Sequence, residues 1–182
     1  MTTTDDSGGH AVDSWPELRW GRSGTALSRA AVRLAATRPG TWAMMRGRGL
    51  DRRILLRTRG RRTLLGPIGA PLLLLVTTGR RSGRPRTTAL VYHRVGHELF
   101  VVGSNYGQTH DPLWCANLRA LPQAVVIMAG RHTPVRAVEV SGPRKDRLYE
   151  DFVQLADVYR AYRGRAGRDI PMFALERTAV SP

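Results

Sequence analysis

The sequence contains little of what a hydrolase, a metalloprotein or a disulfide-bonded protein requires. Cys115 is its only cysteine, so no disulfide can form within the chain. Its five histidines stand apart without the spacing of zinc ligands, so no metal is expected. It also lacks a GxSxG elbow, an HExxH motif, a phosphate-binding P-loop and a Rossmann fingerprint. An enzyme with these absences needs a cofactor that supplies the reactivity.

Long apolar runs are also missing. No stretch reaches the roughly 18 apolar residues of a membrane span, and the longest apolar run, 70–76, has the length of a strand. The first residues, MTTTDDSGGHAVDSWPEL, are polar and acidic and have no apolar core of a secretory signal. The expected location is therefore the cytoplasm.

Acidic residues and lysine are scarce, whereas arginine is abundant. The chain has 29 Lys and Arg against 14 Asp and Glu, and Lys145 is its only lysine. Thirteen arginines and one acidic residue, Asp51, lie in residues 19–62. Such a block predicts an anionic partner. An anionic membrane surface on the inner face of the cell membrane is favoured, and an ordinary helix with its arginines in solvent is the alternative. Specific nucleic acid is not expected, because aromatic side chains do not alternate with the arginines.

Composition divides the chain into three regions. Residues 1–22 are small and polar and predict a disordered tail. Residues 23–63 predict a basic amphipathic helical region, with helices at 23–37 and 41–57. Residues 64–182 predict one compact domain. The oligomeric state is left open.

The compact domain is expected to be mainly β with flanking helices, an α+β fold. Strands are expected at 71–78, 86–95, 98–103, 124–128, 133–140 and 170–176, and helices at 112–121 and from Ser141 through Tyr162. Asp111 is the expected N-cap of the first of these helices. Short hairpins without parallel crossovers indicate an antiparallel barrel, closed or split, with helices packed on it.

The strongest local feature is the basic turn GRRSGRP at 79–85, which follows a strand that is apolar on both faces. Its glycines allow backbone N–H groups to surround an anion, and arginine side chains bind phosphate or carboxylate oxygens in pairs. The turn therefore predicts an anion site. The alternative is a solvent-exposed hairpin tip that binds nothing.

Three blocks in this order resemble a known family. They are TTGRRSGRPRTTAL (Thr77–Leu90), SNYGQTHDPLWCANLRALP (Ser104–Pro122) and VYRAYRGRAGRDIP (Val158–Pro171). Together they resemble the deazaflavin-dependent nitroreductase family, split-barrel proteins of actinobacteria that bind coenzyme F-420. The resemblance runs from about Leu64 to Glu176. It implies an oxidoreductase that transfers a hydride from reduced coenzyme F-420 to a small electrophilic acceptor, such as a quinone, an enone or a nitro compound.

The resemblance also implies which residues act. The first block would bind the phosphate and oligoglutamate tail of the cofactor, and the second would line its ring. The implied cofactor-binding residues are Arg80, Arg81, Ser82, Arg86, Thr87, Thr88, Ala89, Leu90, Val91, Val102, Gly103, Ser104, Asn105, Leu113, Trp114, Cys115, Ala116, Asn117 and Tyr162. The implied catalytic residues are Ser104, which would bond the substrate oxygen, and Tyr159 and Tyr162, which would close the pocket.

Several alternatives remain at this point. Flavin mononucleotide is the second candidate cofactor, because related split barrels bind either ring. A non-catalytic carrier of F-420 or flavin is the second candidate function, and a basic nucleic-acid-binding module is a third. Trp114 is alternatively a core side chain, and Cys115 a small buried filler. Asn105 and the RGRAG stretch differ from the residues that stand at these positions in family members that reduce nitroimidazoles.

Overall fold

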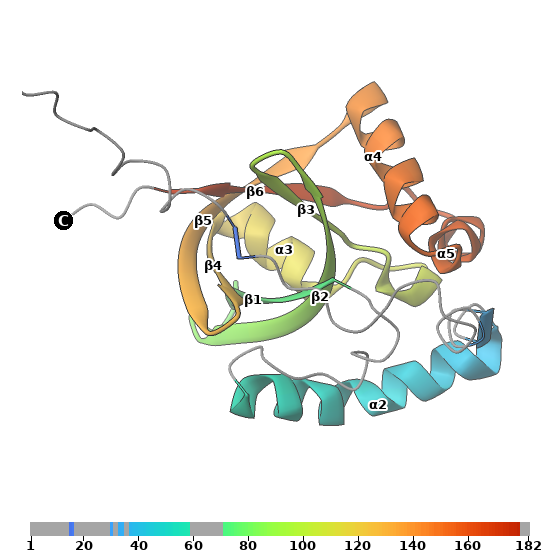
Figure 1. Ribbon diagram of the computed structural model, residues 1–182, viewed down its shortest axis with the longest axis horizontal. Coiled ribbons are helices and arrows are strands. Elements are labelled where there is room, and N and C mark those ends of the chain that lie inside the picture. Colours follow the sequence, from blue (N-terminus) through green and yellow to red (C-terminus); the bar gives the residue numbers. More distant parts are fainter. Residues whose placement is uncertain (1–14, 17–29, 31–32, 35–36, 59–70, 179–182) are drawn as a thin grey trace, which may run out of the picture.

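A computed structural model describes residues 15–16, 30, 33–34, 37–58 and 71–178 (Figure 1). Its elements are α2 (Arg38–Arg57), β1 (Leu72–Thr78), β2 (Pro85–Val95), β3 (Glu98–Val102), the 3-10 helix η2 (Asn105–Gly107), α3 (Leu113–Ala120), β4 (Gln123–Met128), β5 (Arg131–Val140), α4 (Gly142–Leu155), α5 (Val158–Ala166) and β6 (Met172–Arg177). Each expected strand is present, with bounds shifted by at most two residues.

The six strands form one closed antiparallel barrel in the order β1-β2-β3-β6-β5-β4. Three hairpin pairs, β1 with β2, β2 with β3 and β4 with β5, join strands that follow each other in the chain. The last strand, β6, pairs with both β3 and β5. The predicted antiparallel barrel of an α+β fold is confirmed.

Strand β1 is apolar on both faces because both faces are covered. Leu73 and Leu75 belong to the cluster inside the barrel, whereas Leu74 packs against Ile127 in a cluster outside it. Side chains alternate between the two faces of a strand, so only a strand covered on both sides is apolar throughout. This strand leads directly into the basic turn at 79–85, called the arginine turn below, and fixes where that turn begins.

The helices α3, α4 and α5 occupy two different places around the barrel (Figure 1). Helix α3 contributes Trp114, Cys115 and Leu118 to the interior cluster and therefore fills the barrel. Helices α4 and α5 pack outside, where Phe152 and other side chains meet residues of β3 and β6.

One sequence expectation about the helices is wrong. The single helix expected from Ser141 through Tyr162 is two helices, because Ala156 has an extended backbone with φ −159° and ψ 118°. The chain turns there and restarts as α5 after Asp157. Tyr159 and Tyr162 therefore lie on a short separate helix and not at the end of a long one.

Only part of the N-terminal region lies within the described residues. Helix α2 begins at Arg38, three residues before the expected start, and takes Pro39 into its first turn, where proline fits. The helix expected at 23–37 and most of the tail expected at 1–22 lie outside the described residues. Trp15 is described; its indole is buried in the interior cluster, and Nε1 donates to the His97 carbonyl at 2.8 Å. Within the described part of the chain, no helix is long and apolar enough to cross a membrane.

Candidate functional site

The arginine turn between β1 and β2 uses most of its backbone N–H groups internally. The Gly79 N–H donates to the Arg84 carbonyl at 2.9 Å, and the Ser82 and Gly83 N–H groups donate to the Gly79 carbonyl. The Arg84 N–H lies 3.4 Å from Ser82 Oγ. Most amides of the turn therefore already have an acceptor within the protein, so the structure does not favour a ring of amides around an anion.

The guanidinium groups of this turn are the donors that remain. Arg80 and Arg81 of the turn and Arg86 at the start of β2 are exposed, and within the described residues none of the three forms an ion pair with a carboxylate. The Arg86 Nη2 lies 3.4 Å from Ser82 Oγ, which is a weak contact. Three arginines with forked donors and no acidic partner match a group with several phosphate and carboxylate oxygens. The donor set of this turn fits the polyanionic tail of coenzyme F-420.

A buried asparagine fixes the turn to helix α3. The Arg80 N–H donates to Asn117 Oδ1 at 3.1 Å, and Asn117 Nδ2 donates to Thr77 Oγ1 at 3.0 Å. Thr77 and Asn117 are both buried, so these bonds are shielded from water. The sequence placed Asn117 among the cofactor-binding residues, and the structure gives it the distinct task of holding the arginine turn against α3.

The loop 103–108, called the Ser104 loop below, lies between β3 and α3. A Cβ added at Gly103 would lie 2.7 Å from Cys115 Sγ, so the loop starts in close contact with α3. Asn105, Tyr106 and Gly107 then have φ values of 46°, 58° and 75°. Left-handed backbone costs a non-glycine residue roughly 1–2 kcal/mol, so two such residues in sequence must be held by their surroundings.

Tyrosine rings connect the Ser104 loop to α5. The rings of Tyr106 and Tyr162 meet edge to face with centroids 6.1 Å apart, and Tyr162 meets Tyr159 in the same way at 5.8 Å. A Cβ added at Gly107 would lie 3.0 Å from the Tyr162 Cα, so the two backbones touch. Burial raises the pKa of Tyr159 and of Tyr162, so both phenols stay protonated and can donate a hydrogen bond.

The first turn of α3 presents side chains to opposite sides. Leu113 is 79% exposed, whereas Trp114 is buried and packs edge to face on Phe173 inside the barrel. The alternative interpretation of Trp114 as a core side chain thus matches its packing, and its contact with a cofactor stays a prediction. Cys115 is buried and free, and burial raises the pKa of its thiol, so it is a filler as the alternative expected.

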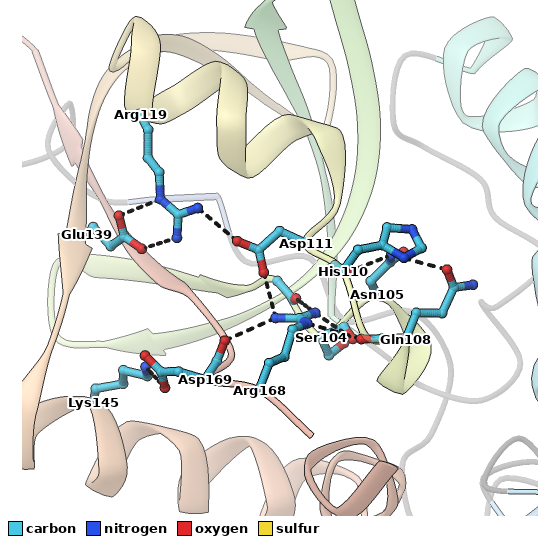
Figure 2. Close-up of polar contacts among 11 residues, drawn as sticks. Ser104, Asn105, Gln108, His110, Asp111, Arg119, Glu139, Lys145, Arg168 and Asp169 are labelled. Carbon is cyan, nitrogen blue, oxygen red and sulfur yellow. Dashed lines mark hydrogen bonds and ion pairs between the residues drawn. The ribbon is translucent and has the colours of Figure 1, made fainter. Parts of the chain in front are cut away.

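Asp111 does not cap α3, contrary to expectation. The N-cap is Pro112, and no side chain bonds the first N–H groups of the helix. Asp111 instead accepts from Arg119 Nη1 at 2.8 Å and from Arg168 Nη1 at 2.6 Å (Figure 2). Charge-assisted bonds to two arginines compete successfully with the capping role.

Two residues near the site were missed by sequence reasoning. Tyr106 adds a third ring to the Tyr159–Tyr162 pair, and the Asn-Tyr-Gly turn signal in its sequence could have indicated a special backbone there. Arg168 bonds several groups of the Ser104 loop, and no local pattern marks it among 28 other basic residues.

The structure brings most of the predicted residues together around α3. Asn117 joins the arginine turn to α3, Gly103 joins the Ser104 loop to it, and Tyr162 touches that loop from α5. The edge residues Thr87, Thr88, Ala89, Leu90 and Val91 of β2 are all partly exposed. Val102, Ser104 and Asn117 are buried, whereas Asn105 and Ala116 are partly exposed. Their contacts with a cofactor stay predictions.

Known proteins described as F420-dependent reductases are similar to this chain. An F420H(2)-dependent quinone reductase of Mycobacterium tuberculosis is 35% identical over 114 residues, covering 61% of this chain and 76% of that protein. A solved structure described as an F420-H2 dependent reductase is 28% identical with a TM-score of 0.54, covering 58% of this chain and 94% of the other. Another, described as a domain-swapped dimer, is 28% identical with a TM-score of 0.56, covering 76% of this chain and 99% of the other.

Residues 57–177 match the protein family described as F420H(2)-dependent quinone reductase. The matched range contains all six strands and the helices α3, α4 and α5. It also contains the three sequence blocks on which the resemblance to deazaflavin-dependent proteins was based, so that resemblance is confirmed. Because the match spans well over half of the chain, this protein belongs to the F420H(2)-dependent quinone reductase family.

Proposed function

We propose that this chain transfers a hydride from reduced coenzyme F-420 to a quinone. The chain is an oxidoreductase of a family that carries this activity in its description. The observation that supports the proposal most directly is the anchoring of the arginine turn on α3 through Asn117, because Gly103, at the start of the Ser104 loop, approaches the same helix at Cys115. Coenzyme F-420, when bound, supplies the hydride.

The chain's residues divide into two groups in this proposal. Arg80, Arg81 and Arg86 bind the phosphate and carboxylate oxygens of the tail, since they are exposed and have no acidic partner among the described residues. The partly exposed segment 87–91 of β2 and the exposed Leu113 offer surface for the ring. Fixing both ends of a long cofactor reduces the freedom of its reacting ring.

The second group acts on the acceptor. Negative charge develops on a quinone oxygen as the hydride arrives, and a hydrogen-bond donor near that oxygen stabilises it. Ser104 and the phenols of Tyr159 and Tyr162 are such donors. The raised pKa values keep the phenols neutral, so they donate a hydrogen bond without losing the proton.

Equilibrium titration tests the cofactor proposal. Wild-type protein is titrated with F-420 and with flavin mononucleotide, and Arg80→Ala/Arg81→Ala is compared with Arg131→Ala, an exposed arginine on β5. We expect F-420 to bind the wild type more tightly than the flavin. Each charge-assisted contact is worth about 1.5–3 kcal/mol, so the double variant should bind F-420 at least about tenfold more weakly. The proposed function would be contradicted if the wild type bound no F-420, or if menadione did not oxidise the reduced F-420 that it binds.

We also propose that α2 lies on the anionic inner surface of the cell membrane, which places the protein in the cytoplasm beside lipid-soluble quinones. The described side chains Trp42, Arg46, Leu50, Arg53 and Arg57 are exposed, and their spacing puts them within about 80° of the helix circumference. Trp42 is 58% exposed with Arg46 over its ring at 4.5 Å. Exposed Trp and Leu among arginines are typical of helices that bind membrane interfaces.

Sedimentation with vesicles tests this surface. We expect the wild type to sediment with phosphatidylcholine vesicles that contain phosphatidylglycerol, but not with phosphatidylcholine alone, because arginines attract the anionic headgroups. Trp42→Ser/Leu50→Ser should reduce binding, whereas Leu121→Ser, which changes an exposed leucine at the C-cap of α3, should not. Equal binding by both variants would exclude this face of α2 as the contact.

A further inference from the structure

The Ser104 loop has a backbone that its own sequence does not favour. Asn105 and Tyr106 both adopt left-handed φ values before Gly107 does. Within the loop, the Gly107 N–H donates to the Ser104 carbonyl at 2.8 Å, and the Gln108 N–H donates to the Asn105 carbonyl at 3.1 Å. These local bonds exist in many turns, so further contacts must select this conformation over more relaxed ones.

Arg168 supplies those contacts. Its Nε donates to the Gln108 carbonyl at 3.0 Å, and its Nη2 donates to the Gly103 carbonyl at 3.0 Å and the Ser104 carbonyl at 3.4 Å. One guanidinium therefore bonds both ends of the loop (Figure 2). The side chain is only 14% exposed, so water competes weakly for these bonds.

The remaining donors of Arg168 tie the loop to its neighbours. Nη1 donates to Asp111 Oδ1 at 2.6 Å and to the Asp169 carbonyl at 3.1 Å. Asp111 in turn accepts from Arg119 of α3. An arginine has five N–H donors in a fixed plane, and all five have an acceptor here. A lysine has three donors on one atom and cannot reproduce this set.

The position of Arg168 in the chain gives these bonds a second consequence. Arg168 follows Gly167, the left-handed residue that ends α5, and α5 carries Tyr159 and Tyr162. The same side chain thus fixes the Ser104 loop relative to the end of the tyrosine helix and to the start of α3. Its partners Gly103 and Gln108 are 65 and 60 residues away in sequence.

We propose that Arg168 is a positioning residue for acceptor reduction. It holds the backbone of the Ser104 loop, so that Ser104 keeps its place and the Tyr106 ring stays against the Tyr162 ring. The role rests on the proposed function, because Ser104 and Tyr162 act on the acceptor there. The arginine turn that binds the tail lies between β1 and β2, and no described bond joins it directly to Arg168. Loss of Arg168 should therefore affect turnover more than cofactor affinity.

The test compares Arg168→Lys with Arg163→Lys, an exposed arginine on α5 that pairs with Glu150. The F-420 dissociation constant is measured by titration, and kcat and KM for menadione are measured per bound cofactor. We expect Arg168→Lys to lower kcat roughly 10- to 100-fold, as misplacement by about 1 Å does, with F-420 affinity changed less than about threefold. Arg163→Lys should change neither by more than about twofold.

A double-mutant cycle with Ser104→Ala tests whether Arg168 acts through the loop. If it does, Ser104→Ala should lower kcat much less in the Arg168→Lys background than in the wild type. Independent, multiplicative losses would overturn the proposal. So would an unchanged kcat in Arg168→Lys.

Amide hydrogen exchange of the ligand-free protein gives a readout that does not depend on activity. Arg168→Lys should increase exchange in 103–108 at least tenfold, whereas Arg163→Lys should leave it unchanged; equal exchange in both would overturn the proposal. If Arg168→Lys does not fold, Asp111→Asn replaces it, because this variant removes only the carboxylate charge. It should increase amide exchange in 103–108 by a smaller factor, and unchanged exchange there would overturn the proposal. A wild type that lacks F-420 binding would contradict the proposed function while leaving this exchange test in force.

Discussion

Removing the Asn117 side chain should weaken the binding of the cofactor's tail without weakening the binding of its deazaflavin ring. Asn117→Ala deletes the bonds to the Arg80 N–H and to Thr77 Oγ1, at 3.1 and 3.0 Å. Each hydrogen bond is worth about 1 kcal/mol, and the Arg80 N–H is left without its acceptor, so we expect a loss of about 2–4 kcal/mol in the free energy of unfolding. The turn would then be free to move away from α3.

The consequence for binding follows from the position of Arg80. A displaced turn loses at least one charge-assisted contact, worth about 1.5–3 kcal/mol, so F-420 should bind Asn117→Ala roughly 10- to 150-fold more weakly. The deazaflavin chromophore without phosphate and glutamates should bind both proteins within about threefold. Titration monitored by chromophore fluorescence measures the affinity for both ligands. It is carried out without urea, at a temperature where each protein is fully folded.

Thr77→Val is the matched control. It removes the bond from Asn117 Nδ2 but leaves the bond from the Arg80 N–H to Asn117, so it should destabilise the protein by about 1 kcal/mol and preserve F-420 affinity. Equal weakening of F-420 and of the bare chromophore by Asn117→Ala would refute the reasoning, because it would show that the turn does not bind the tail. So would a loss of stability with unchanged affinity for both.

Three further outcomes are expected. Gly107→Ala should lower the free energy of unfolding by about 1–3 kcal/mol in urea titrations, because the residue has φ 75° and its Cβ would lie 3.0 Å from the Tyr162 Cα. Cys115 should react with a thiol reagent only when the protein unfolds, since burial raises its pKa and excludes the reagent; rapid native labelling would contradict its burial. Stability should fall as the pH rises above about 10, because burial raises the pKa of Tyr149 to about 12 and also that of Tyr159, so the unfolded chain loses these protons first. Urea midpoints that stay constant from pH 9 to about 11 would contradict this.

The local sequence determined the strands and their hairpins. Alternating or fully apolar segments predicted all six strands within two residues, because side chains alternate between the two faces of a strand and the apolar pattern then depends on which faces are buried. Gly96 and Gly130 marked two of the hairpin turns, where both adopt positive φ. The blocks at 77–90, 104–122 and 158–171 together predicted the family, which the family match confirms.

Local sequence patterns did not predict the break between α4 and α5. The sequence around Ala156 contains no proline or glycine, so its helical spacing of apolar residues appeared continuous through Tyr159. The packing of Phe152 and Tyr159 against each other, with ring centroids 5.3 Å apart, is compatible with two short helices as well as with one long helix. Only the arrangement on the barrel distinguishes the two.

The arginine turn shows the same division between sequence and structure. Its residues predicted an anion site from composition alone, but whether amides or guanidinium groups face the anion depends on the bonds within the folded turn. Asn117 reaches Arg80 across 37 residues of sequence, and Arg168 reaches Gly103 across 65. Sequence patterns report on neighbours within a few residues, so partners this distant are decided only when the closed barrel brings their segments together.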